Sequence, residues 1–531
     1  MIVNVACLTV LMVASATAQS PRPVAQAVGP EPVVVKVTHD IRVVRNTVSE
    51  STRALVPQGM VNVPAGEVVL GTPAEDVEKL GQGDKTNMTL IAAEVPRHAL
   101  TVDEFFIDMT EVTNLQWKVF LDATRRQPSS VLVEYGWPEG KIPAGEEQYP
   151  VGNVNIPEIR DFLAWCGKRL PTEAEWVRAA RGAEAAAYPW GDRWNSKACQ
   201  SGMSVPAVPV AVGSHVEGKS PFGVFDLAGN VFEWVDSPFV QYPGFEPLDW
   251  KRGREKVKIS PEFNSTQKVI KGGAFNSTRE LCRVDFRTGF NPSDSDAGLG
   301  FRAARSAEPA LDTVRHAYEK LAPPSLLTDG IDVGDIFGIE VTDYDNERKV
   351  IENYRYLAFA HRAFGLTPAY SRLKKDTVDE PFVVGILTTS EELKQPLLPA
   401  GSYAVAFKGK GESKRYKEWE KEQRRNGGRD QNLPERAGDV MVPWPGIPVQ
   451  DVVEDIEFDQ EVEALVFLNA NNAIVGMVPA LEAKDADTTT LEAERLDDGR
   501  KWKLGFSVPS KGRRSPFFQF ELELAGEPLN P

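Results

Sequence analysis

Residues 183–305 restrict the possible fold more than any other segment, because they contain many Gly, Pro, Asn and Trp residues and few periodic hydrophobic runs. Glycine and proline interrupt regular helices and strands, and glycine and asparagine favour turns. Tryptophan side chains provide large apolar surfaces that can hold irregular loops in place. The segment therefore predicts a compact domain with few regular elements.

Three helices with clear start signals are predicted before this segment. Thr113 and Gln116 form a capping box, and Pro157 suits the first position of a second helix that ends before Gly167. A second capping box at residues 172–175 predicts a third helix that ends near Gly182. Residues 60–71 (MVNVPAGEVVLG) are interpreted as two strands around a Pro-Ala-Gly turn, a plausible hairpin.

The first 18 residues form an apolar run that ends in Ala-Thr-Ala, the pattern of a signal peptidase site. We interpret residues 1–18 as a signal peptide, although no Lys or Arg precedes the run; the alternative is an ordinary apolar strand or helix. Export predicts a periplasmic, cell-surface or extracellular location. Residues 19–57 are interpreted as a linker with one added strand at 33–37.

Charge and composition exclude several classes of function. The 531 residues carry a formal charge of -16, which disfavours binding to nucleic acid or to an anionic membrane. After removal of the signal peptide three cysteines remain, at 166, 199 and 282, so at most one internal disulfide is possible. No two of the five histidines have metal-ligand spacing, and a zinc site is unsupported.

The pattern changes after residue 306. Helices are predicted at 310–321 and 348–364, within a helical connector at 307–375 that contains a boundary at Pro323 and Pro324. Strand-like runs then recur at 382–388, 402–407, 462–468, 474–478, 502–508 and 517–524. This spacing predicts a β-sandwich in a β-rich domain at 376–531. The densely charged residues 408–438 favour a solvated helix or loop over a nucleic-acid patch, because acids alternate with bases.

Seven segments in a fixed order resemble the formylglycine-generating enzyme family, also called the sulfatase-modifying factor family. They are 60–66 (MVNVPAG), 105–114 (FFIDMTEVTN), 167–182 (GKRLPTEAEWVRAARG), 188–192 (YPWGD), 223–234 (GVFDLAGNVFEW), 271–275 (KGGAF) and 300–305 (GFRAAR). The resemblance covers residues 58–306 and implies an α+β, C-type-lectin-like fold of low regular content. Family members include copper- and oxygen-dependent oxidases that convert a sulfatase cysteine to formylglycine, enzymes of ergothioneine biosynthesis, and binding modules.

The resemblance also implies what the oxidase reaction requires, a pair of cysteines five residues apart that holds Cu(I). Cys282 matches the second cysteine, but Ser277 occupies the first position, and Ala274 stands where the oxidase has a serine. Cu(I) prefers soft thiolates, and a serine hydroxyl is a hard, protonated group. We therefore do not expect copper. Cys282 remains the single catalytic candidate. The alternative interpretation is that Cys282 is a packed small side chain with a structural role.

The resemblance implies one structural calcium site. Asp226, Gly229, Val231 and Glu233 occupy the family's ligand positions and would supply two side chains and two backbone carbonyls. Hard oxygens in a tight glycine turn suit Ca²⁺. The alternative is a solvent-facing acidic turn.

The function predicted from the sequence is a non-oxidase binding module for a protein or glycan ligand. Its ligand-binding candidates lie in the loops at 274–297 and are Arg283, Arg287, Phe290, Asn291 and Asp294. One alternative is an enzyme, a divergent copper- and oxygen-dependent oxidoreductase of the formylglycine-generating type that uses Cys282. Another is a structural component of the cell envelope, assembled through the β-sandwich.

Overall fold

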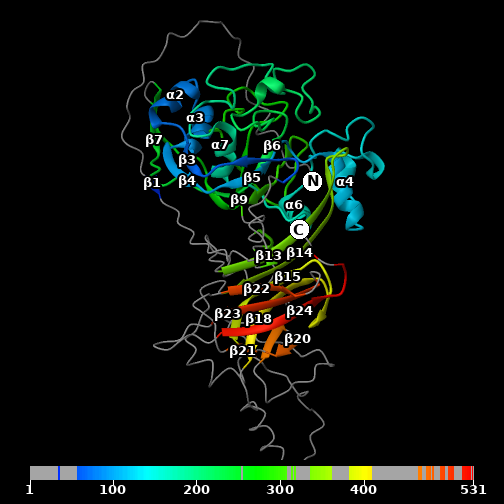
Figure 1. Ribbon diagram of the computed structural model, residues 1–531. Coiled ribbons are helices and arrows are strands. Elements are labelled where there is room, and N and C mark those ends of the chain that lie inside the picture. The colour runs from blue at the N-terminus through cyan, green and yellow to red at the C-terminus, as the bar shows by residue number, and fades with distance from the viewer. Residues whose placement is uncertain are drawn as a thin grey trace, which may run out of the picture. The chain divides into compact units, whose positions relative to one another are not determined.

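The computed structural model (Figure 1) describes residues 34–35, 57–252, 255–307, 312–314, 316–317, 335–361, 382–408, 464–468, 474–479, 481–483, 491–496, 500–507, 517–527 and 529. The predicted signal peptide, most of the linker and nearly all of the charged segment at 408–438 lie outside these residues. Within them, no helix is long and apolar enough to cross a membrane.

Short helices occupy the first half of the chain. The α-helices are α2 (Val77–Leu80), α3 (Lys85–Ile91), α4 (Asn114–Ala123), α5 (Ser130–Tyr135), α6 (Ile156–Trp165) and α7 (Glu173–Arg181). The 3-10 helices are η2 (Ala74–Asp76), η3 (Ala92–Glu94), η4 (Pro138–Gly140) and η5 (Val216–Gly218). Side-chain caps begin α3, α4, α5, α6 and α7. Full capping boxes begin α4, α6 and α7, which confirms the three predicted helices.

The strands of this half form four small sheets. Their orders are β1 (Val34–Val35)–β4 (His98–Val102)–β3 (Gly66–Leu70); β10 (Thr288–Phe290)–β9 (Asn264–Lys271)–β6 (Phe232–Phe239)–β11 (Leu299–Gly300); β12 (Ala304–Ser306)–β5 (Phe105–Asp108)–β2 (Met60–Val63); and β7 (Leu248–Arg252)–β8 (Glu255–Ile259). The predicted hairpin at 60–71 is wrong, because β2 pairs with β5 whereas β3 pairs with β4. Between α7 and β6 the chain forms only the single turn of η5, as expected for the irregular segment.

The helical connector predicted at 307–375 is also wrong over much of its length. Helical turns occur at residues 312–314 and 316–317, but β13 (Asp335–Asp345) and β14 (Val350–His361) form a long antiparallel hairpin. Residues 357–360 of β14 are all buried, so both faces of the strand are covered. Such a continuous apolar run cannot be distinguished from a buried helix by periodicity alone.

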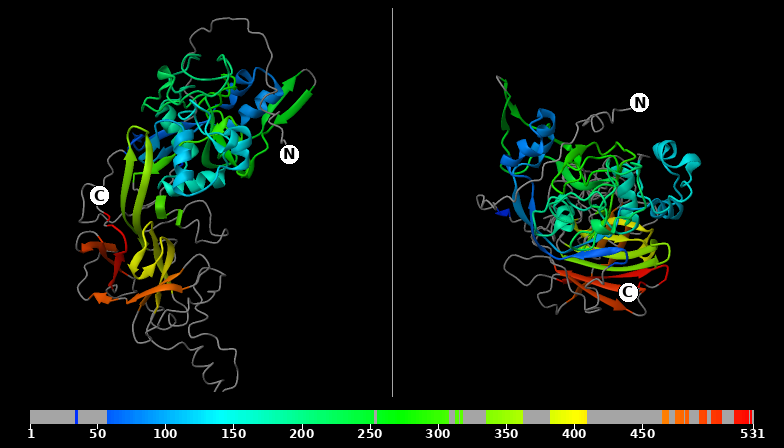
Figure 2. Two further views of the ribbon diagram at one scale, coloured as in Figure 1. Left: turned by 90° about the vertical axis from the view of Figure 1, so that its right-hand side faces the viewer. Right: turned by 90° about the horizontal axis from the view of Figure 1, so that it is seen from above.

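The β-rich C-terminal part consists of two sheets around one core (Figure 2). One has the order β13–β14–β15 (Phe382–Thr389)–β18 (Gly401–Lys408)–β19 (Ala464–Leu468)–β20 (Ile474–Pro479). The other has the order β17 (Leu397–Leu398)–β16 (Leu393–Gln395)–β24 (Phe517–Leu524)–β23 (Lys501–Ser507)–β22 (Leu491–Leu496), with β21 (Leu481–Ala483) beside β24. Side chains of both sheets, among them Phe359 and Phe520 with ring centroids 5.6 Å apart, form the shared core. The six predicted strands are present, and this packing is that of a β-sandwich.

The β13–β14 hairpin also contacts the helices of the first half. The Gln116 Nε2 donates to the Lys349 carbonyl at 3.0 Å. Tyr354 of β14 lies so close to Gly167, which follows α6, that a Cβ there would be 2.1 Å from the phenol ring. The hairpin therefore belongs to the sandwich and packs against α4 and α6 as well.

Candidate functional site

The segment that carries the predicted oxidase positions lies between β9 and β10. Two glycines with positive φ, Gly272 and Gly273, turn the chain after β9. Ser277 follows in a tight turn, where its Oγ accepts from the Ala274 N–H at 2.9 Å and its own N–H donates to the Ala274 carbonyl at 2.9 Å. Ser277 is 4% exposed, so its hydroxyl serves the turn.

Cys282 is completely buried, with no exposed surface. It packs in an apolar cluster with Tyr188, Cys199 and Ala228, and a Cβ at Gly273 would lie 2.8 Å from its Sγ. Burial raises the pKa of the Cys282 thiol well above its usual value. Because the thiolate is the nucleophile and the metal ligand, the geometry favours the packed side chain over the catalytic candidate.

The other two described cysteines have the same character. Cys166 and Cys199 are buried and free, and burial raises the pKa of each thiol to about 12. Among the described residues, therefore, no thiol is positioned to react readily at neutral pH.

The predicted calcium ligands lie in a buried turn, and one of them is already engaged. The Glu233 carboxylate accepts from Arg302 Nε and Nη2, both at 2.7 Å, and from Trp176 Nε1 at 2.8 Å. Arg302 and Glu233 are both fully buried, so the guanidinium neutralises the carboxylate. Glu233 therefore does not fit a calcium ion. Of the four predicted calcium ligands, Glu233 is the one that the structure contradicts.

Asp226 instead faces Glu111, a residue to which sequence reasoning assigned no role. The Glu111 Oε1 accepts from Asn230 Nδ2 at 3.0 Å, whereas the buried Oε2 has no hydrogen-bond partner. The Asp226 Oδ2 accepts from the Gly213 N–H at 2.6 Å, and its carboxylate lies within hydrogen-bonding reach of Glu111. Burial raises the pKa of both groups, with the charge of Asp226 as a further cause at Glu111. Two buried carboxylates in contact require a proton or a cation between them.

Within the described part of the chain, no group of three or more His, Cys, Asp or Glu side chains is arranged to hold a metal.

Two of the predicted ligand-binding residues are not at the surface. Arg283 is 6% exposed and forms a bidentate pair with Glu94, at 3.0 Å and 2.6 Å. Arg287 is 2% exposed, pairs with Glu173 at 3.0 Å and lies over the Tyr242 ring. Their exposure was predicted incorrectly, because the acidic partners lie far away in the sequence.

The other three candidates are more accessible. Phe290 is half-buried and packs edge-on against Trp234. Asn291 is exposed and donates to the half-buried Asp294 at 3.1 Å. Only this last pair offers polar groups to an external ligand.

An exposed apolar loop at residues 201–208 lies against the Ser277 turn. Its Gly202 N–H donates to the Ser277 carbonyl at 2.8 Å, and Gln200 Nε2 donates to the carbonyls of Pro206 and Val208. Met203 is 67% exposed and Val205 is 98% exposed. Sequence reasoning missed this loop, because small apolar residues next to prolines gave no signal of exposure.

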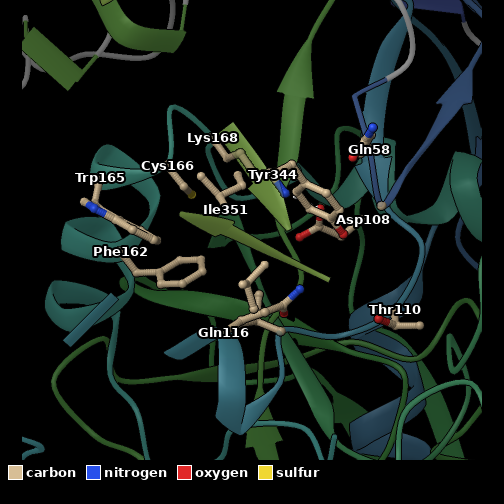
Figure 3. A pocket seen from close by; sticks show the side chains of 13 residues that line it. Gln58, Asp108, Thr110, Gln116, Phe162, Trp165, Cys166, Lys168, Tyr344 and Ile351 are labelled. Atoms are coloured by element: carbon tan, nitrogen blue, oxygen red, sulfur yellow. Dashed lines mark hydrogen bonds and ion pairs between the residues drawn. The ribbon is translucent and has the colours of Figure 1, made fainter. Parts of the chain in front are cut away.

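A small cavity lies where α6 meets the β13–β14 hairpin (Figure 3). Its volume is about 40 Å³, and its lining includes Tyr344 and the ion pair of Lys168 with Asp108, whose N–O distance is 2.6 Å. A cavity of this size holds about one or two water molecules. It is therefore too small for a substrate.

Residues 44–307 match the family model described as "Sulfatase-modifying factor enzyme 1-like domain". That part of the chain therefore belongs to the family, and its mixture of helices and strands is an α+β fold.

Three curated relatives are similar over this region. Hercynine oxygenase of Mycolicibacterium smegmatis is 29% identical over 46% of this chain and 60% of its own length. Formylglycine-generating enzyme of Streptomyces coelicolor is 28% identical over 47% of this chain and 90% of its own length. Inactive C-alpha-formylglycine-generating enzyme 2 of Mus musculus is 28% identical over 47% of this chain and 86% of its own length. The chain thus spans about three fifths of the hercynine oxygenase, and residues beyond 307 lie outside the family match.

Proposed function

We propose that this protein is a non-oxidase member of its family, which binds a protein or glycan ligand. One observation carries the proposal: the segment at 277–282 offers no pair of accessible soft ligands. The Ser277 hydroxyl is held by the Ala274 N–H, and Cys282 is fully buried. A relative whose name describes it as inactive, at 28% identity, is a precedent for the fold without the oxidase reaction.

The exposed loop at 201–208 is the best candidate for the binding surface. Its apolar side chains lie beside the Ser277 turn, so a ligand at this turn would contact them. Apolar contact area favours a protein ligand with an apolar segment over a glycan at this surface.

This surface is tested by selecting displayed random peptides on the full-length protein and measuring their Kd by calorimetry. We expect apolar peptides whose affinity falls at least tenfold in Val205→Asp. Tyr135→Asp is the matched control, because Tyr135 is 60% exposed on α5, and it should leave the Kd unchanged. Peptides that bind Val205→Asp and Tyr135→Asp equally well would contradict a role for the loop.

We also propose a calcium ion held by Asp226 and Glu111 together with the carbonyls of Gly229 and Val231. The buried, unpartnered Oε2 of Glu111 supports this ligand set, and two carboxylates with carbonyl oxygens suit Ca²⁺. A ligand present at 100 times its Kd stabilises the folded state by about 2.7 kcal/mol.

The calcium proposal is tested by thermal unfolding with calcium or with a chelator. We expect calcium to raise the Tm of the wild type and to have no effect on Glu111→Gln. Glu173→Gln, a buried carboxylate elsewhere in the domain, should keep the calcium effect. An unchanged Tm in the wild type would show that a proton, not a cation, joins the two carboxylates.

Export and assembly stay proposals. Amino-terminal sequencing of the mature protein after cell fractionation tests cleavage before Gln19, and a chain that keeps residues 1–18 in the cytoplasm would contradict it. The alternative role as an envelope component predicts self-association, and a monomer at high concentration by light scattering would argue against that role.

A further inference from the structure

A cavity of about 230 Å³ lies away from the Ser277 turn and from the acidic pair. Side chains of α4 and α6, of the helical turns at 312–314 and 316–317, and of strands β14, β15 and β18 line it. We call it the aromatic–hydroxyl pocket, and its volume equals that of roughly eight water molecules. It is large enough for one sugar-sized ring.

Aromatic rings form the apolar part of this pocket. Trp165 is half-buried and is held by Phe120 and Phe162, with ring centroids 5.7 Å and 5.9 Å away. Tyr356 adds a half-buried phenol. Fixed aromatic faces are suited to stack against a flat apolar surface of a ligand.

Hydroxyl groups form the polar part. Ser402 is half-buried, and its Oγ hydrogen-bonds to Oγ1 of Thr388, which is 1% exposed, at 2.9 Å. The buried Thr313 bonds to the Tyr354 phenol at 3.0 Å. Burial raises the pKa of Tyr356, so its phenol stays protonated and remains a donor. A hydroxyl both donates and accepts, so these groups match a ligand that itself carries several hydroxyls.

The charges at the pocket balance each other. Arg126 forms an ion pair with Asp161, and its guanidinium lies 5.6 Å from the centre of the Phe120 ring. His316 Nε2 donates to the Lys168 carbonyl at 2.6 Å, which leaves Nδ1 as an acceptor in the neutral ring. A neutral ligand therefore fits better than an anion or a cation. A ligand with hydroxyls can use the donor and acceptor capacity that Ser402 keeps beside its hydrogen bond with Thr388.

We infer that the aromatic–hydroxyl pocket binds a neutral pyranose unit of a carbohydrate. A pyranose has an apolar face of C–H groups for the rings and a rim of hydroxyls for Ser402, whose Oγ is oriented by its hydrogen bond with Thr388. The proposed function leaves a protein or a glycan ligand open, and this inference adds a glycan site separate from the loop at 201–208, with which the pocket shares no residue. Its failure would leave the peptide-binding proposal unaffected.

The full-length protein is titrated with the methyl pyranosides of glucose, galactose, mannose and N-acetylglucosamine. Saturation-transfer NMR and tryptophan fluorescence follow binding, with a Kd of about 1 mM expected for a ligand of this size. Ser402→Ala and Thr388→Val remove hydroxyls with little change in volume, and each should weaken the preferred sugar about 2- to 10-fold. Trp165→Leu should abolish binding.

Two controls make the outcomes decisive. Trp190→Phe changes a half-exposed tryptophan outside the pocket and should leave the Kd unchanged. Glucuronate and glucosamine, which carry a charge, should bind more weakly than the neutral sugar. The inference is overturned if the folded wild type gives no saturation transfer with any neutral sugar. It is equally overturned if Ser402→Ala, Thr388→Val and Trp165→Leu all bind with the wild-type Kd.

Discussion

Removal of Arg302 tests the assignment of Glu233 as a structural partner and not a calcium ligand. Arg302→Met keeps much of the side-chain volume but leaves the buried Glu233 carboxylate with only the Trp176 N–H as a partner. Removing one partner of a buried ion pair costs about 3–5 kcal/mol. The variant also deprives the Asp108 and Phe225 carbonyls of their Arg302 donors. A loss near the upper end of that range is therefore expected, against a total stability of about 5–15 kcal/mol.

Urea unfolding followed by tryptophan fluorescence measures this loss. Eight of the eleven tryptophans lie between residues 117 and 250, so the signal reports mainly the family domain. Lys118→Met is the matched control, because it breaks an exposed pair with Asp122 and should cost less than about 0.5 kcal/mol. The loss in Arg302→Met should persist when a chelator removes calcium. A loss below about 1 kcal/mol, or one that requires calcium, would refute the assignment.

Three further predictions concern the thiols, acid stability and the packing of the β13–β14 hairpin. The three described thiols should resist alkylation at pH 8 in the folded protein and react in urea, as mass spectrometry would detect; rapid labelling of the folded protein would contradict their burial. Burial favours the protonated form of Glu175, but the charge of Arg169 and hydrogen bonds lower its pKa below the usual value. Its contribution to stability is therefore present above about pH 4.5 and is lost as the pH falls through the lowered pKa, and Glu175→Gln should flatten this part of a stability–pH curve. Gly167→Ala should destabilise the protein by about 2–4 kcal/mol, because a positive φ and the Tyr354 ring both oppose the Cβ. Gly83→Ala, at a similar φ with nothing within 4 Å, should cost only about 1–2 kcal/mol in the same urea titration; equal losses would show that Tyr354 does not limit the space.

Local signals in the sequence predicted much of the fold. The side-chain caps at Thr113 and Thr172 act within three residues, so they could be identified without knowledge of the tertiary structure. The family motifs identified residues 58–306, and residues 44–307 match the family model. The regularly spaced apolar runs predicted the strands of the sandwich. These features depend on residues close together in the sequence.

The features that were missed depend on residues far apart in the sequence. β14 was predicted to be a helix. It is a strand because it pairs with β13, and this pairing is not visible in the sequence of β14 itself. Arg283 was predicted to be exposed. Its buried partner Glu94 lies 189 residues earlier, so the local sequence does not show that the charge of Arg283 is paired. Glu111 received no role because its neighbour Asp226 lies in another motif. Burial and charge pairing of this kind are fixed by tertiary packing, which a single sequence does not reveal.

An assay for formylglycine tests directly whether the protein lacks the oxidase activity. The purified protein is loaded with Cu(I), supplied with oxygen and incubated with a peptide that contains Cys-x-Pro-x-Arg, and the product is analysed by mass spectrometry. We predict an unmodified cysteine, because Ser277 supplies no thiolate and Cys282 is buried. Formation of formylglycine by the wild type, and its loss in Cys282→Ser, would contradict a binding module without oxidase activity.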